Sequence, residues 1–180
     1  MNGSTDTPTP YMKWVKSQAD VLVPLLRHLR AELGVERANE LVYPVLREYM
    51  KEWIVEFASK ESDNPIVNFY KTSDRLEATF EGDVEYSVLK HDDEKFDLNV
   101  TSCKYAEFFR QLDEPELGAI LVCEADNHIA DLSAPNVEFS RTDTIMKGGA
   151  CCPFRYRFYH QEKVINGPEG LLTSRSAEHP

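Results

Sequence analysis

Apolar side chains recur every three or four positions through the first third of the chain. This spacing places them on one face of a helix and predicts two helices, over residues 11–33 and 35–59. Pro24 and Pro44 interrupt the pattern, and Pro44 is expected to kink or split the second helix because a proline removes a backbone hydrogen bond. Together the two segments predict a helical hairpin laid over a sheet.

From Leu76 onward the hydrophobic period changes to two, which is typical of strands with one buried face. Short polar turns divide this region into three stretches and predict an antiparallel meander over 76–80, 84–88 and 96–100. Two helical stretches and two further alternating stretches follow, over 104–112 and 113–128 for the helices and 137–141 and 154–158 for the strands.

The predicted fold class is α+β. The N-terminal helical hairpin packs on a mostly antiparallel sheet of about five strands, with two helices inserted in the middle of the sheet. We expect a single domain over residues 11–160, preceded by a disordered lead-in at 1–10 and followed by a polar C-terminal tail at 161–180.

The formal charge of the 180-residue chain is −11, which opposes binding to nucleic acid or to anionic membranes. The longest uninterrupted apolar run, Ala119 to Cys123, is too short to span a bilayer, and no signal peptide is visible. We therefore expect a cytoplasmic protein with free thiols and a small molecule as its partner. A homo-oligomer is also compatible with this composition.

All four cysteines fall within residues 98–159, and three interpretations of them stay open. A zinc site would take three thiolates with His128 or Asp126, but Cys103 and Cys123 lack the close spacing of most structural zinc ligands. A cysteine nucleophile would need a base such as His128, oriented by Asp126, and Cys103 is the best placed candidate because it precedes a helix. Buried cysteines can also be small apolar side chains. No cofactor is expected, since zinc is not favoured.

Several other residues have both a structural and a functional interpretation. Asp126 shares a helical face with Cys123 and is either a helix-end hydrogen-bond acceptor, a general base for water or an anchor for a cationic amidine. Arg141 and Arg155 are candidates for a clamp on a substrate carboxylate, or solvated strand residues. Trp53 could line a ligand pocket or belong to the core.

Four segments of residues 98–159 stand out together: Cys103-Lys104-Tyr105-Ala106-Glu107, Cys123-Glu124-Ala125-Asp126, Phe139-Ser140-Arg141-Thr142 and Gly148-Gly149-Ala150-Cys151-Cys152-Pro153-Phe154-Arg155-Tyr156. With these segments, the sequence strongly resembles the L-2-amino-thiazoline-4-carboxylic acid hydrolase family over residues 98–159. The late family motif is Gly-Asp-x-x-Cys-Asp-Phe. Here Gly149 and Pro153 stand at its two acidic positions, and Cys152, rather than Cys151, stands at its cysteine.

The resemblance implies hydrolysis of a cyclic amidine-like or amide C–N bond in a small carboxylated heterocycle, giving a carbamoyl amino acid. A thiolate or an activated water would attack the amidine carbon, Asp126 would hold the amidinium, and an arginine would receive the substrate carboxylate. It further implies that Cys103, as nucleophile or ligand, lies close to Cys123 and Cys152.

A second hypothesis is a small-molecule binding or sensor module without catalysis. A helical hairpin over a sheet with late cysteines resembles vinyl-reductase-type (4VR) ligand-binding domains. This hypothesis predicts an apolar pocket lined by Trp53, Phe108 and Phe109, with no ionisable pair inside it.

Overall fold

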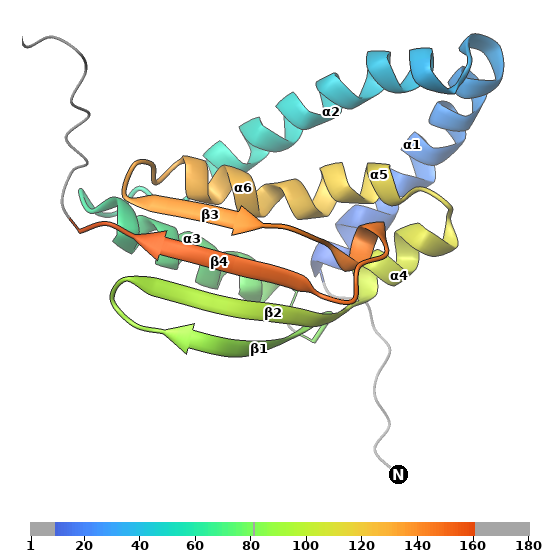
Figure 1. Ribbon diagram of the computed structural model, residues 1–180. Coiled ribbons are helices and arrows are strands. Elements are labelled where there is room, and N and C mark those ends of the chain that lie inside the picture. The colour runs from blue at the N-terminus through green and yellow to red at the C-terminus, as the bar shows by residue number, and fades with distance from the viewer. Residues whose placement is uncertain (1–9, 81, 161–180) are drawn as a thin grey trace, which may run out of the picture.

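The computed structural model describes residues 10–80 and 82–160 and begins with a hairpin of two long helices (Figure 1). Helix α1 spans Pro10–Leu33 and helix α2 spans Val35–Phe57, joined by Gly34 in the left-handed conformation, with φ of 84°. Glycine suits this turn because it has no Cβ to clash there. The expected split at Pro44 is wrong, because α2 runs through it as one helix.

The predicted first strand, residues 76–80, is also wrong, because this segment ends helix α3, Pro65–Thr79. The side chain of Asn64 caps the helix by accepting hydrogen bonds from the amides of Ile66 and Val67, and Pro65 occupies the first turn. The buried residues follow the helical period rather than a period of two: Ile66, Phe69, Thr72 and Leu76.

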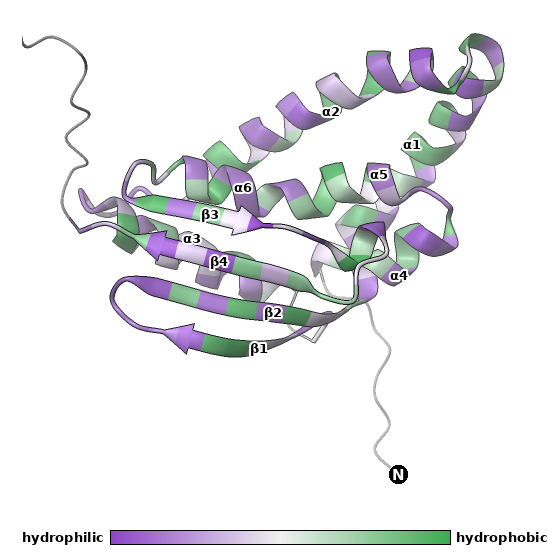
Figure 2. Ribbon diagram, in the orientation of Figure 1, coloured by the Kyte–Doolittle hydropathy of each residue, from purple (hydrophilic) through white to green (hydrophobic). Residues whose placement is uncertain are grey.

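The sheet has four strands in the order β1-β2-β4-β3, and every neighbouring pair is antiparallel. Their bounds are Val84–His91 for β1, Lys95–Cys103 for β2, Val137–Arg141 for β3 and Cys152–Phe158 for β4. Hydrophobic and hydrophilic residues alternate along β2, as the pleat requires (Figure 2). The α+β class is therefore confirmed, with four strands rather than the five expected.

Between β2 and β3 the chain forms a helical segment that underlies the sheet. It comprises α4 at Lys104–Gln111, α5 at Pro115–Gly118, a π-helical turn η1 at Ala119–Cys123, and α6 at Glu124–Asp131. Helix α2 packs on η1 and α6, and α6 packs on β3 (Figure 1). The hairpin thus rests largely on the inserted helices and reaches the sheet through Ile54, which belongs to one cluster with Tyr156 and Phe158.

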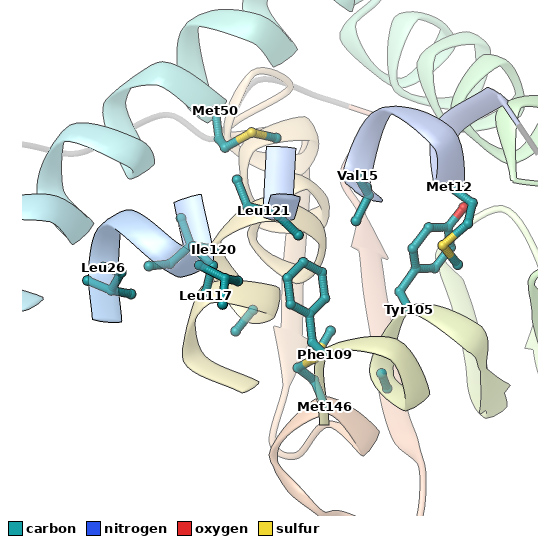
Figure 3. Close-up of a cluster of buried hydrophobic side chains, with 14 of the residues drawn as sticks. Met12, Val15, Leu26, Met50, Tyr105, Phe109, Leu117, Ile120, Leu121 and Met146 are labelled. Atoms are coloured by element: carbon teal, nitrogen blue, oxygen red, sulfur yellow. The ribbon is translucent and has the colours of Figure 1, made fainter. Parts of the chain in front are cut away.

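The main core lies where α1, α4, the inserted helices and the short 3₁₀ helix η2, Ile145–Lys147, meet. Phe109 is fully buried beside Met146, with Leu117 and Leu121 close by (Figure 3). Gly118 allows this close approach, because a Cβ built there would lie 2.6 Å from both Met146 Sδ and Phe109 Cγ. This packing holds α4 and η2 against the helix that leads to Cys123.

None of the helices in the described part of the chain is long and apolar enough to cross a membrane. Residues 1–9 of the expected lead-in and the expected tail at 161–180 lie outside the described residues, and Pro10 already belongs to α1.

Candidate functional site

Three of the four cysteines come from separate elements that meet beneath the sheet. Cys103 ends β2 and is the N-cap of α4, Cys123 ends the π-helical turn, and Cys152 begins β4. Cys152 pairs with Val100 across the β2–β4 ladder and shares an apolar cluster with Cys103. The Cys152 Sγ accepts a hydrogen bond from the amide of Ile145 at 3.2 Å. A strand end, a helical turn and a strand start thus bring together thiols that are far apart in sequence.

Asp126 and Arg141 form the charged pair of the site. The Nη1 of Arg141 donates to Asp126 Oδ2 at 2.7 Å, while its Nη2 donates to the backbone carbonyl of Cys123 at 2.8 Å. The side chain of Arg141 is 8% exposed and that of Asp126 is 24% exposed. The guanidinium also lies over the rings of Phe139 and Phe154, at 5.5 and 5.1 Å from their centroids. Arg141 therefore fixes both Asp126 and the end of the π-helical turn.

Burial disfavours the charged form of every acidic group in this site. It raises the pKa of Asp126 above its usual range, and the nearby Arg141 offsets only part of this rise. Burial likewise raises the pKa of Cys103 to about 11, although the amides of Ala106 and Tyr105 at the start of α4 act in the opposite direction. Burial is also the main cause that raises the pKa values of Cys123 and Cys152. The negative charge of Asp126 raises both pKa values further. The resting site therefore holds neutral thiols around a carboxylate whose proton affinity is increased.

Two tyrosines border the same group and were not predicted from the sequence. Burial raises the pKa of Tyr11, and the charges of Asp126 and Cys123 add to the rise, which places its phenol near both. The Tyr11 hydroxyl donates to the carbonyl of Leu121 at 3.2 Å. The pKa of Tyr156 is also raised, first by burial and then by Asp126. Tyr156 and Cys152 both point to the buried face of β4, so the alternation of residues along this strand could have identified Tyr156. No sequence pattern indicates that Tyr11 belongs to the site.

Other predicted site residues lie elsewhere. His128 is two positions after Asp126, and residues with this spacing do not share a helical face; its Nε2 is buried without a hydrogen-bond partner. Arg155 lies on the outer side of the sheet, where it donates to the carbonyl of Leu98 at 2.9 Å and to Asn99 Oδ1 at 3.0 Å. Neither is brought to the Asp126–Arg141 pair.

The three aromatic residues predicted to line a pocket, Trp53, Phe108 and Phe109, are all packed against other rings. Trp53 stacks between Trp14 and Phe57 at 5.5 and 5.1 Å, and it borders the site only through Tyr11, whose ring is 6.0 Å away. Phe108 packs edge-on against Phe109 at 5.1 Å and lies below the ammonium group of Lys16. Trp53 is thus an outer neighbour of the site, whereas Phe108 covers the core.

An open cavity of about 400 Å³ lies along α6 and β3, and neither Asp126 nor Arg141 is among its lining residues. Asn127, Phe139, Ser140 and Arg155 are among its lining residues, and Phe139 also contacts the Arg141 guanidinium. Across residues 10–80 and 82–160, no group of three or more His, Cys, Asp or Glu residues is arranged to hold a metal ion.

Gly149 lies beside a carboxylate from another position in the chain. A Cβ built on Gly149 would lie 2.4 Å from the Cγ and both carboxylate oxygens of Asp143. The carboxylate of Asp143 therefore occupies the space that a side chain at position 149 would need.

The family model for L-2-amino-thiazoline-4-carboxylic acid hydrolase matches residues 14–156, which is most of the chain. The chain belongs to the L-2-amino-thiazoline-4-carboxylic acid hydrolase family. The match extends the resemblance seen in residues 98–159 to the helical hairpin, and it includes every residue of the charged pair and of the three-thiol group.

Comparisons with individual proteins add little to the family assignment. No curated protein matches the chain. Among solved structures, one similar chain is the crystal structure of the phenol-responsive sensory domain of the transcription activator PoxR with phenol. The two share a TM-score of 0.41 and 17% sequence identity, over 76% of this chain and 72% of that chain.

Proposed function

We propose that this member of the L-2-amino-thiazoline-4-carboxylic acid hydrolase family opens a small carboxylated heterocycle by hydrolysing a cyclic amidine-like C–N bond. One observation carries the proposal: Asp126 is held by Arg141 at 2.7 Å, with a raised pKa, beside three thiols. General bases work best when their pKa is raised toward the operating pH, so burial of Asp126 favours a catalytic role.

The neutral state of the thiols favours activated water over a cysteine nucleophile. With the pKa of Cys103 at about 11, about one molecule in 10⁴ would carry the thiolate at pH 7. Thiolate nucleophiles need a lowered pKa or an adjacent base, and His128 is not placed beside these cysteines. We therefore assign Cys103, Cys123 and Cys152 to the wall of the site, as neutral side chains that shape it and exclude bulk water.

The proposed reaction consumes only the substrate and one water molecule. Asp126 takes one proton from a water molecule, whose oxygen bonds to the carbon of the protonated amidine while the C=N π pair moves to the ring nitrogen. The ring C–N bond of this tetrahedral adduct then breaks, and its electron pair stays on the ring nitrogen, which receives the proton from Asp126. The hydroxyl of the adduct gives up its proton as the carbonyl forms, and this proton passes to the departing amine, which leaves as an ammonium. The product is a carbamoyl amino acid with a free ammonium group, and Asp126 returns to its ionised form.

Arg141 acts in this scheme as a positioning residue. Its two guanidinium nitrogens are engaged by Asp126 and by the Cys123 carbonyl, so it orients the base rather than receiving the substrate. Arg155 lies on the outer side of the sheet, bonded to the Leu98 carbonyl and to Asn99, so it is not assigned to the carboxylate of a substrate held at Asp126.

The test is a hydrolysis screen with purified protein on 2-amino-thiazoline-4-carboxylate, its oxygen analogue, lactams and carbamoyl amino acids. Turnover is detected as a new primary amine and the mass of one added water. Asp126→Asn is expected to lower kcat/KM by about 10²-fold or more, because it removes the general base. Asp63→Asn, at an exposed aspartate of the α2–α3 connection, is the matched control and should leave turnover unchanged.

Variants of Cys103 distinguish attack by an activated water from attack by a cysteine thiolate. Cys103→Ala should retain most of the activity if water is the nucleophile, whereas complete loss in both Cys103→Ala and Cys103→Ser would contradict the proposal in favour of a thiolate. A substrate that binds without being consumed would support the sensor-module hypothesis instead. Absence of both binding and turnover across the screen would remove the proposed substrate class.

A further inference from the structure

The hairpin of α1 and α2 presents an apolar face that the rest of the described chain does not cover. On α2, Leu41, Val45 and Tyr49 follow one another at a spacing of four and are 46%, 67% and 43% exposed. On α1, Val21 and Leu25 are exposed with the same spacing. Large apolar patches rimmed by polar residues mark interaction surfaces.

Both stripes point away from the body of the protein. The opposite side of each helix is buried against the fold, at Val23 on α1 and Met50 on α2. Half-buried Leu22 and Val42 pack against the same core, each next in sequence to an exposed residue of its stripe. In Figure 1 the hairpin leans away from the sheet, with its connecting turn at the far end. Each helix of the hairpin thus has an exposed apolar stripe on the side away from the fold.

The charge of this hairpin differs from that of the whole protein. Residues 10–57 contain seven Lys or Arg and seven Asp or Glu, so their formal charge is zero, whereas the whole chain carries −11. Two copies that met through any acidic surface would repel each other. The neutral hairpin allows two copies of this chain to approach without that repulsion.

The outward face of α2 is also symmetric about Val45. Leu41 and Tyr49 lie four residues on either side of it, and the cation Arg37 and the anion Glu52 lie eight and seven residues away. In an antiparallel crossing centred on Val45, Leu41 meets Tyr49 of the second copy and Arg37 meets Glu52 of the second copy. Such self-complementarity is what a two-fold interface requires, because each residue contacts its counterpart on the same surface.

We propose that two copies of this chain associate through the outward faces of their α1–α2 hairpins, with α2 crossing its counterpart antiparallel at Val45. The four helices form a bundle whose centre contains Leu41, Val45 and Tyr49, with Val21 and Leu25 of α1 at its sides. Arg37 also pairs with Glu40 of its own helix at 3.3 Å, but both side chains are exposed and such a pair contributes little. The proposal concerns the exposed side of α2, away from the inserted helices, and is independent of the proposed reaction.

The experiment measures molar mass by light scattering after gel filtration over a range of protein concentrations. Wild type is expected to be a dimer at micromolar concentrations, and Val45→Glu is expected to be a monomer with an unchanged circular dichroism spectrum, because Val45 is already 67% exposed. Val67→Glu, at an exposed valine of α3, is the matched control and should remain a dimer.

A charge exchange tests the register. Arg37→Glu and Glu52→Arg should each weaken the dimer by about tenfold, since each places like charges together twice per interface, and the double variant should restore it. A monomer at all concentrations, a dimer that survives Val45→Glu, or a double variant as weak as its parents would each overturn the proposal.

Discussion

Replacing Arg141 with methionine isolates the contribution of the charged pair. Methionine keeps a long apolar side chain between the rings of Phe139 and Phe154, so much of the packing is retained. Asp126 meanwhile loses the guanidinium that lies 2.7 Å from its Oδ2. The variant thus leaves a largely buried carboxylate without its counter-charge.

The expected loss of stability depends on pH. Removing one partner of a buried ion pair costs about 3–5 kcal/mol, and we expect about 3 kcal/mol at pH 8 because Asp126 is 24% exposed. The pKa of Asp126 is already raised by burial, and removal of Arg141 raises it further. A raised pKa contributes stability that is present at low pH and is lost as the pH rises through the folded-state pKa. At pH 5 the variant can protonate Asp126, so we expect its deficit relative to wild type to shrink.

Urea unfolding at pH 5 and pH 8 measures this effect in wild type, Arg141→Met, Asp126→Asn and the double variant. The double variant should recover part of the stability lost at pH 8, because it contains no unpaired charge. An equal loss for Arg141→Met at both pH values would refute the electrostatic reasoning. So would a double variant at least as unstable as Arg141→Met alone.

Three further predictions concern the surroundings of the site. Gly118→Ala should destabilise the fold by about 1–3 kcal/mol in urea unfolding, because its Cβ would overlap Phe109 and Met146; a neutral effect would contradict the packing. Alkylation of Cys103, followed by mass spectrometry, should be slow at pH 7 and should accelerate up to a pKa of about 11, whereas a midpoint near 9 would show an unperturbed thiol. Gly149→Asp should destabilise by crowding the Asp143 carboxylate, and Gly149→Asp combined with Asp143→Gly should restore stability, which thermal unfolding would reveal.

The alternation of apolar residues predicted all four strands. In β2, β3 and β4 it reflects a partly buried face, whereas the residues of β1 after Val84 are exposed. The same reasoning failed at residues 76–80, where alternation over five residues coincides with the end of a helix. The decisive signal there is the Asn64-Pro65 pair, a cap and a first-turn proline that begin α3. Alternation of apolar residues over only five positions is weaker evidence for a strand than an upstream cap is for a helix.

The site was predictable only in part. Asp126 and Cys123 were placed on one face by their spacing, and the family resemblance indicated Cys103 and Cys152. The pairing of Asp126 with Arg141 depends on how α6 packs on β3, which no local pattern encodes. Tyr11 joins the group from a helix more than a hundred residues earlier, through a contact that only the tertiary structure creates.

The π-helical turn at Ala119–Cys123 makes the length of the inserted segment a determinant of the site. A π-helical turn accommodates one residue more than an α-helical turn. Deleting one of residues 119–122 would restore a regular helix and rotate Cys123 and Asp126 together by about 100° relative to α5. The two residues could then no longer face Arg141 while α5 keeps its own packing. Along this segment, a change in chain length would disturb the site more than a conservative change of side chain, so insertions and deletions are the variations that selection should remove first.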